Sequence, residues 1–221
     1  MSKINSEDNY NESNKRYYRE LNKTDPDFEL LITLMKEYNI APDTTTELKP
    51  FNCNEILHEA VKRGRIDLID RILELGVNIN AKTINYENAL QLAIYLNNIE
   101  IADKLIKAGA DVNADINNRG GLIIHDAIKR GNPKIIKMLL DAGANITQVN
   151  EGKTILSFID HYLYTSIHRS EITKLIKDKL NIQLFQEIRK PNGGNPDIII
   201  ELIKFGSDMN VVKKEGRYFI T

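Results

Sequence analysis

One motif returns along this chain at nearly constant intervals, and that period constrains the fold more than any other feature. Leu57, Leu90 and Ile124 open its copies, so the sequence interval is first 33 (90 − 57) and then 34 (124 − 90). A glycine closes each copy and an alanine recurs inside it, both at the same intervals. The glycines are Gly76, Gly109 and Gly143, and the alanines are Ala60, Ala93 and Ala127. Because independent markers agree on one period, the sequence predicts a protein built from stacked repeats.

The best-defined copy predicts a pair of short helices. Apolar residues recur at helical spacing in 89–96 and again in 100–108, so each helix has one apolar side, and a polar break separates the two. Gly109 follows at the position where a left-handed residue ends a helix. Two helices of this length have nothing of their own to bury those sides against, so each pair needs neighbours. We therefore expect an all-α solenoid.

The residues after each glycine extend the motif. The runs are Gly-Val-Asn-Ile-Asn-Ala from position 76, Gly-Ala-Asp-Val-Asn-Ala from 109 and Gly-Ala-Asn-Ile-Thr from 143. Together with the leucine–histidine pair at 57–58, these runs resemble the ankyrin repeat. The resemblance implies an ankyrin-repeat α-solenoid of about five helix-pair repeats, with short β-hairpin turns between repeats. It also implies that His58 and His125 bond the backbone of adjacent repeats.

The rest of the chain divides around three clear repeats at 54–148. Residues 1–13 form a polar tail that we expect to be disordered. Residues 14–53 are interpreted as a degenerate N-terminal repeat and its loop, since their apolar residues match the spacing of the later second helices and solenoids need capping units. Residues 149–182 are a fourth repeat, and residues 183–221 are a fifth repeat with a C-terminal tail.

The fourth and fifth repeats are irregular. The run SFIDHYLYTSIHRS, from position 157, continues past the expected break, so we expect an extended inner helix and then a second helix at 171–180. The fifth repeat is expected as an inner helix at 184–190 and an outer helix at 196–205. Residues 215–220 then fall where a further repeat would open. This tail is either a closing cap or part of a longer array.

Composition limits the partners of the chain. Its 221 residues include 30 basic and 31 acidic ones, and the net charge of −1 favours neither nucleic acid nor an anionic membrane. The sequence has no apolar run of about 18 residues, and its polar N-terminus lacks the apolar core of a signal peptide. A single cysteine, Cys53, leaves no internal disulfide and fits a reducing compartment, so we expect a cytoplasmic location.

No pattern predicts a catalytic centre, a cofactor site or a metal site. The run Gly-Lys-Thr at 152–154 lacks the glycine that a phosphate-binding loop needs five residues earlier, where Thr147 stands. The pair His-Glu at 58–59 opens like a zinc-protease motif, but Lys62 occupies the position of its second histidine. Cys53 lacks a base with an orienting partner. We therefore predict a non-enzymatic protein without a cofactor.

The resemblance implies a protein–protein interaction module that binds through a concave side, formed by hairpin tips and the exposed ends of inner helices. By matching motif positions, the partner-binding residues are Lys62, Arg63, Tyr86, Tyr95, Leu96, Asn118, Arg119, Lys129, Arg130 and Tyr162. Basic pairs at 62–63 and 129–130 flank the tyrosine–leucine pair at 95–96, and tyrosine and arginine are enriched at interface hot spots. We predict a partner protein with an acidic edge and an apolar anchor. The alternative is a generic solvated surface.

A second candidate surface carries the aromatic residues Phe158, Tyr162 and Tyr164 of the fourth repeat. Extra aromatic length in a repeat often projects from the binding face. The alternative, which we favour, is that these rings pack against the fifth repeat.

Three functions fit the sequence. The first is a non-enzymatic adaptor or inhibitor that is monomeric alone, with a pathogen-derived effector acting in the host cytosol as its more specific form. The second is the targeting part of a larger enzyme whose catalytic region lies beyond residue 221. The third is a structural or homo-oligomeric role through an uncapped end of the array.

Overall fold

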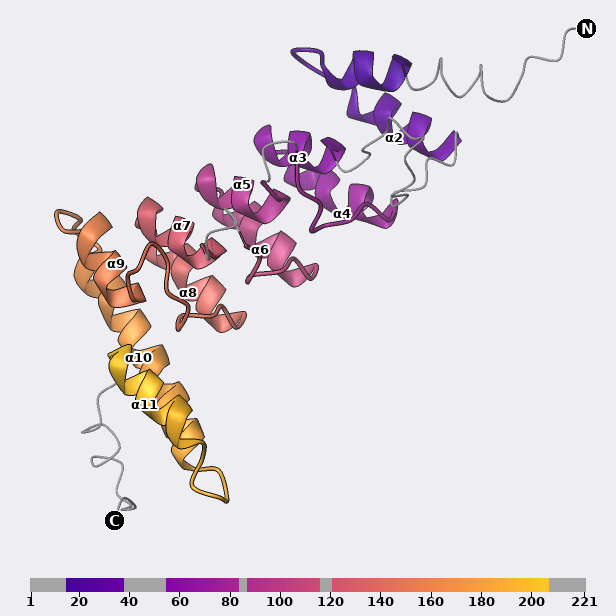
Figure 1. Cartoon of the computed structure of the whole chain (residues 1–221). Helices are drawn as coiled ribbons and strands as arrows, with labels where there is room; N and C mark the ends of the chain where they lie inside the picture. Colours follow the sequence, from indigo (N-terminus) through magenta and orange to yellow (C-terminus); the bar gives the residue numbers. More distant parts are fainter. Residues whose placement is uncertain (1–14, 38–54, 84–86, 116–120, 207–221) are drawn as a thin grey trace, which may run out of the picture. The chain divides into compact units, whose positions relative to one another are not determined.

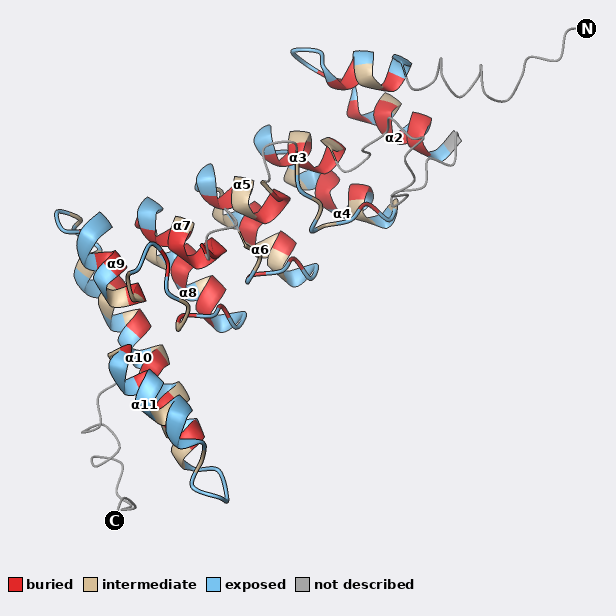
Figure 2. Cartoon of the chain, in the orientation of Figure 1, coloured by how far each residue is buried: buried red, intermediate tan, exposed pale blue. Residues whose placement is uncertain are grey.

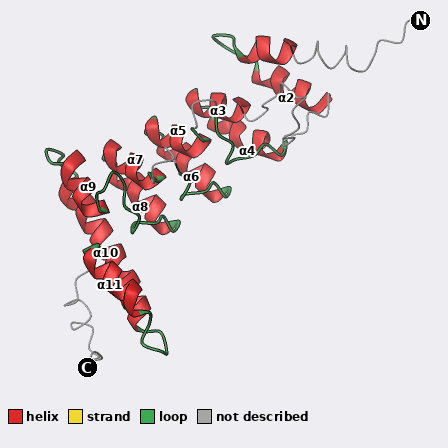
Figure 3. Ribbon diagram, in the orientation of Figure 1, coloured by secondary structure: helices red, strands yellow, loops and turns green. Residues whose placement is uncertain are grey.

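The structure, a computed structural model, describes residues 15–37, 55–83, 87–115 and 121–206 (Figure 1). Regular structure in these ranges is helical (Figure 3), and three isolated antiparallel bridges accompany the helices. This part of the chain is therefore all-α, as the sequence predicts. The chain forms two compact units, residues 1–110 and residues 111–221.

The first unit is made of helix pairs. Residues 15–21 are helical, and they are followed by α2 (Phe28–Glu37), α3 (Glu55–Lys62), α4 (Ile66–Glu74), α5 (Ala89–Tyr95) and α6 (Ile99–Lys107). α3 packs against α4 and α5, and α6 packs against α4 and α5. These are the contacts of two stacked pairs, in which α3 and α5 are the inner helices and α4 and α6 the outer ones.

The second unit begins with the same arrangement and ends differently. Its helices are α7 (Ile123–Arg130), α8 (Pro133–Asp141), α9 (Ile155–Tyr162), α10 (Arg169–Ile188) and α11 (Pro196–Lys204). α7 packs against α8 and α9, while α10 packs against α8, α9 and α11. None of the helices in the described ranges is long and apolar enough to cross a membrane.

The core of the first unit is the apolar stripe that the repeat predicts (Figure 2). In α3 and α5, Leu57, Ala60, Leu90 and Ala93 are each at most 1% exposed. Fully burying a leucine side chain stabilises a fold by roughly 1.5–3 kcal/mol. Alanine at the second position adds little bulk, so the two inner helices can approach closely. The recurring residues are therefore core positions, and their burial requires the neighbouring helix.

A left-handed residue separates the inner from the outer helix. Gly64, Asn97 and Gly131 hold the same repeat position and have φ angles of +69°, +56° and +70°. Glycine adopts this conformation without a Cβ penalty, and asparagine tolerates it better than most residues. Asn98 then caps α6, because its side chain accepts a hydrogen bond of 3.1 Å from the first turn of that helix. Gly109, predicted to end α6, is also left-handed, at φ +94°.

Short antiparallel bridges occur where hairpin turns are predicted. They join Lys82 to Asn88, Asp115 to Leu122, and Asn150 to Lys153. In the second unit, Asn113 from the run after Gly109 contacts the next such run. Its side chain donates to the carbonyl oxygen of Gly143 at 3.3 Å and accepts from the N–H of Asn145 at 2.7 Å. The asparagine of the repeated run therefore ties two successive turns together in this unit.

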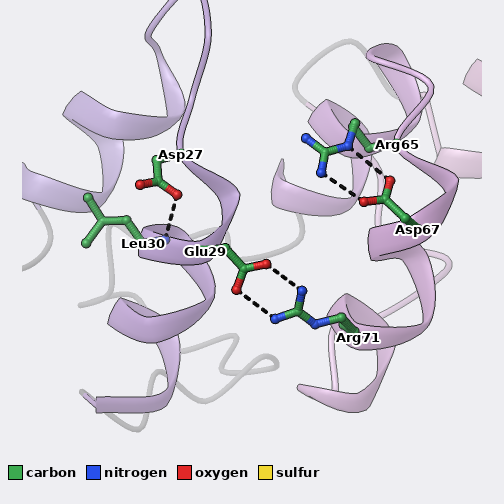
Figure 4. A network of polar contacts seen from close by, with 6 residues as sticks. All are labelled: Asp27, Glu29, Leu30, Arg65, Asp67 and Arg71. Atoms are coloured by element: carbon green, nitrogen blue, oxygen red, sulfur yellow. Dashed lines mark hydrogen bonds and ion pairs between the residues drawn. The ribbon is translucent and has the colours of Figure 1, made fainter.

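The N-terminal helices contact the α3–α4 pair through polar groups (Figure 4). Glu29 of α2 accepts two bonds from the guanidinium of Arg71 in α4, at 2.5 and 2.8 Å, and this pairing lowers the pKa of the Glu29 carboxyl. Arg65 pairs with Asp67 and lies 5.5 Å from the ring centroid of Phe28. The predicted apolar face of α2 is buried, at Leu31, Ile32 and Met35. A capping role for residues 14–53 stays a prediction.

The fourth inner helix is not extended, so the sequence prediction is wrong here. α9 ends at Tyr162, and the chain turns because Leu163 is buried beside Gly131, where a Cβ would lie 3.2 Å from Leu163 Cδ2. The long helix is α10, which joins the predicted helices 171–180 and 184–190 into one. No glycine or proline interrupts it, and its buried residues continue through the expected break at four-residue spacing: Ile172, Ile176, Leu180 and Leu184.

The substitution Asn97→Ala is expected to lower the free energy of unfolding by about 1 kcal/mol, because alanine resists a left-handed backbone. Asn97→Gly removes the same side chain but accepts the φ of +56°, so it is expected to change stability by less than about 0.5 kcal/mol. Urea unfolding followed by circular dichroism compares the three proteins. Equal destabilisation by both substitutions would contradict the backbone explanation.

Candidate functional site

Seven of the ten predicted partner-binding residues lie in the described ranges, all at the C-terminal ends of inner helices. Tyr86, Asn118 and Arg119 lie outside those ranges. In the first unit, the described residues are Lys62, Arg63, Tyr95 and Leu96 at the ends of α3 and α5. In the second unit, they are Lys129, Arg130 and Tyr162 at the ends of α7 and α9. Each unit therefore has its own candidate surface.

The candidate surface of the first unit consists of Lys62, Tyr95 and Leu96, which we call the Tyr95 rim. Tyr95 is 56% exposed and Leu96 is 43% exposed, although Ala93 and Ile94 directly before them are fully buried. Lys62 and Tyr95 hold the same repeat position on two helices that pack together. The rim therefore presents adjacent apolar side chains beside a basic one, in surface that the helix stack does not cover.

Arg63 makes structural hydrogen bonds, and its predicted binding role stays a prediction. Its guanidinium donates to the carbonyl oxygens of Lys23 and Thr24, at 3.2 and 2.6 Å, and its Nε donates to Glu59 at 2.5 Å. Only 28% of this side chain is exposed. Arg63 thus ties the turn before α2 to the end of α3. Of the predicted basic pair, Lys62 is the exposed member, with 67% of its side chain accessible.

The second unit brings Lys129 and Tyr162 together, as part of a group that also includes Glu151 and Phe158. Lys129 Nζ lies 5.0 Å from the ring centroid of Tyr162 and 5.5 Å from that of Phe158, within the range of cation–π attraction. Glu151, in the turn before α9, accepts a hydrogen bond of 3.1 Å from the Tyr162 hydroxyl. Its carboxylate is 3.8 Å from Lys129 Nζ. We call these four residues the Lys129 cluster.

Phe158 is the buried base of the Lys129 cluster. Its ring is fully buried, with centroids 5.1 Å from the His125 ring of α7 and 4.4 Å from the Tyr162 ring. Phe158 therefore packs on α7, and the prediction of an exposed surface is wrong for this ring. Packing against the fifth repeat stays a prediction. The spacing of Phe158 with Ile155 and Ile159 is the helical core pattern that identifies it as a buried residue.

Electrostatics hold the exposed part of the Lys129 cluster together. The hydrogen bond from Tyr162 lowers the pKa of the Glu151 carboxyl, and the charges of Lys129 and Lys153 act in the same direction. Partial burial raises the pKa of the Tyr162 phenol, and the bond to Glu151 adds to that effect. At neutral pH, the carboxylate is therefore ionised and the phenol keeps the proton that it donates. Glu151 therefore links Tyr162 and Lys129 within the cluster. Sequence analysis did not identify Glu151 in this role.

The two repeat histidines have structural roles. His58 Nε2 lies 3.1 Å from the carbonyl oxygen of Glu87 in the next repeat, as the resemblance implies. The N–H of Leu122 donates to Nδ1 of His125 at 3.0 Å, so the neutral ring of His125 carries its proton on Nε2. Burial lowers the pKa of His125, which favours this neutral form. Among the described residues, no three potential metal-ligating side chains lie together.

Comparison with protein families decides the fold family. A family model described as ankyrin repeats, in three copies, matches residues 57–150. Residues 57–150 of this chain are ankyrin repeats. The matched ankyrin repeats include the Tyr95 rim and Lys129, whereas Tyr162 and helices α9 to α11 lie outside the match. Comparison with curated proteins gave no match. Ankyrin repeats are generally protein–protein interaction modules.

The substitution Tyr162→Phe is expected to raise the pKa of Glu151 toward its ordinary value of 4.5, because the phenol no longer donates to the carboxylate. Because folding lowers this pKa, the bond contributes to stability fully above pH 4.5, and the contribution is lost as the pH falls through the folded-state pKa. Carboxyl carbon NMR measures the pKa, and urea unfolding at several pH values measures the stability.

The control for this experiment is Tyr164→Phe, which removes a hydroxyl from a tyrosine that is 73% exposed. It is expected to change neither the pKa of Glu151 nor the pH dependence of stability. A stability difference between the wild type and Tyr162→Phe that grows in acid would contradict the assigned hydrogen bond.

Proposed function

We propose that this ankyrin repeat protein is a non-enzymatic adaptor that binds a partner protein through the Tyr95 rim. The observation that carries the proposal is the exposure of Tyr95 and Leu96 directly after the buried stripe of α5. A tyrosine offers a large, rigid apolar ring with a hydrogen-bonding tip, which is why tyrosine is enriched at binding hot spots. The rim lies within the repeats of a family that generally binds proteins.

The chemistry of the rim defines the partner. The apolar anchor of the partner packs on Tyr95 and Leu96, and the acidic edge of the partner faces Lys62. Lys62 Nζ lies 3.8 Å from the nearer carboxylate oxygen of Glu59. The lysine side chain is nevertheless 67% exposed, so its charge is accessible to a partner. Arg63 takes no part, because its guanidinium is bonded to the turn at 23–24.

The second unit makes a smaller contribution in this proposal. Lys129 is held over two aromatic rings and beside Glu151, so moving it toward a partner would break those contacts. Arg130, next to it, is exposed at the end of α7. Partner recognition is therefore concentrated on the Tyr95 rim, and the Lys129 cluster keeps the ends of α7 and α9 in place.

The double substitution Tyr95→Ala with Leu96→Ala is expected to weaken partner binding at least about thirtyfold, since hot-spot residues contribute roughly 2 kcal/mol or more. Lys62→Glu is expected to slow association with an acidic partner and to reduce its salt dependence. Quantitative affinity purification with the wild type and the variants identifies the partner, and calorimetry with the purified partner measures the dissociation constants.

A matched control is Tyr164→Ala with Ile167→Ala, which removes a tyrosine and an aliphatic residue that are 73% and 87% exposed. It is expected to leave binding unchanged. Partners that bind the Tyr95/Leu96 variant as tightly as the wild type would overturn the proposal. Circular dichroism of each variant establishes that the helices are intact.

A further inference from the structure

Helix α10 has one apolar face that the structure covers and a second face, with apolar and charged residues, that it leaves open. The covered face is the buried stripe that packs against α8, α9 and α11. On nearly the opposite side, Asp178, Ile182, Phe185 and Arg189 follow one another at intervals of four, three and four residues, which is one face of a helix. Ile182 is 52% exposed, and Arg189 lies 4.5 Å from the ring centroid of Phe185. We call these four residues the Ile182 face.

The Ile182 face borders an open groove of about 730 Å³. The groove has an apolar middle, formed by Ile182 and Phe185, and charged ends. Asp178 lies at one end, and Arg189 and Lys190 lie at the other. Such a groove suits a short segment with large apolar side chains flanked by charged ones.

Helix α11 is uncovered in the same way. Ile198 stands eight positions before Gly206 (206 − 198), the position of Leu68 before Gly76, Ile101 before Gly109 and Ile135 before Gly143. Those three residues are at most 1% exposed, whereas Ile198 is 39% exposed. Within the units, α4 is followed by α6 and α8 by α10, and each packs against its successor. The α10–α11 pair has no such successor in the described ranges.

The chain continues with residues that fit this position. The offset from a repeat glycine to the start of the next inner helix is 13 for α5 (89 − 76), 14 for α7 (123 − 109) and 12 for α9 (155 − 143). Phe219 has an offset of 13 from Gly206 (219 − 206), with Tyr218 and Ile220 on either side. The tail therefore has its apolar cluster in the register where an inner helix opens. Its other apolar residues are Val211 and Val212, and its charged ones include Lys213, Lys214 and Glu215.

We propose that residues 211–220 pack on the Ile182 face and cover the last helix pair. Phe219 and its neighbours bury the apolar middle of the groove, in the same way that one inner helix packs on the preceding one in the first unit. This docking is independent of the Tyr95 rim, because it involves a different face in the other unit.

Photo-crosslinking in the full chain tests the docking. The substitution Ile182→p-benzoylphenylalanine places a photoreactive ring on an exposed position of α10. After irradiation and trypsin digestion, the expected product joins peptide 180–189 to peptide 218–221. Irradiating a mixture of isotope-labelled and unlabelled chains separates crosslinks within one chain from those between two copies.

Two variants make the test specific. Phe219→Asp is expected to reduce the crosslink about tenfold, because a charge replaces the ring that the groove buries. Ser207→Asp adds the same charge to the tail without removing an apolar group, and it is expected to preserve the crosslink. A photoreactive residue at Ile167, which is 87% exposed before α10 begins, is expected to give no crosslink to the tail.

The outcomes separate the possible occupants. Crosslinks within one chain that depend on Phe219 support the proposal. Crosslinks between labelled and unlabelled chains would show that a second copy covers the Ile182 face, and the proposal would be wrong. Crosslinks only to other peptides of the same chain, or none at all, would overturn it equally.

Discussion

The helix pairs of this protein depend on one another, because a single pair leaves most of its apolar surface in water. In the first unit, α3 meets α5 and α4 meets α6, so residues such as Leu57 and Ala93 are buried by a neighbouring pair. A second constraint follows from the first. Stacking covers the sides of the inner helices and leaves their ends open, so a residue at a helix end, such as Tyr95, can be large and apolar without contributing to the core.

Because each helix pair needs neighbours to bury its apolar surface, the first and last pairs of the described chain differ from those between them. At the N-terminal end, polar contacts such as Glu29 with Arg71 join α2 to the first clear pair. Such exposed ion pairs contribute little stability, and their value lies in fixing how the helices meet. At the other end, Ile182 and Ile198 remain exposed although they lie on apolar faces. Exposed apolar residues that lie together mark a surface on which another segment or protein can pack.

Most of the fold can be predicted from the period of the sequence. The side-chain contacts around the candidate sites cannot, because they join residues that are far apart in the sequence. The period predicts the paired helices and the left-handed Gly109, because both depend on local residue types. The prediction of an extended α9 fails because the helix ends where Leu163 packs beside Gly131, a contact distant in sequence. The predicted break at 181–183 fails because the repeat pattern indicates two helices where the sequence has no glycine or proline to end the first one. The hydrogen bonds of Arg63 were not predicted, because its partners lie far away in the sequence, in the turn at 23–24. Repeat position alone does not predict such contacts.

Mutual burial of neighbouring pairs is tested most directly by hydrogen exchange in the variant Ala60→Leu. Ala60 is fully buried in α3, and a larger side chain there overpacks the core at a cost of about 1–3 kcal/mol. Stacking predicts that amide protection falls in both pairs of the first unit, α3–α4 and α5–α6, because each stabilises the other. Loss of protection confined to α3 and α4, with α5 and α6 unchanged, would contradict it.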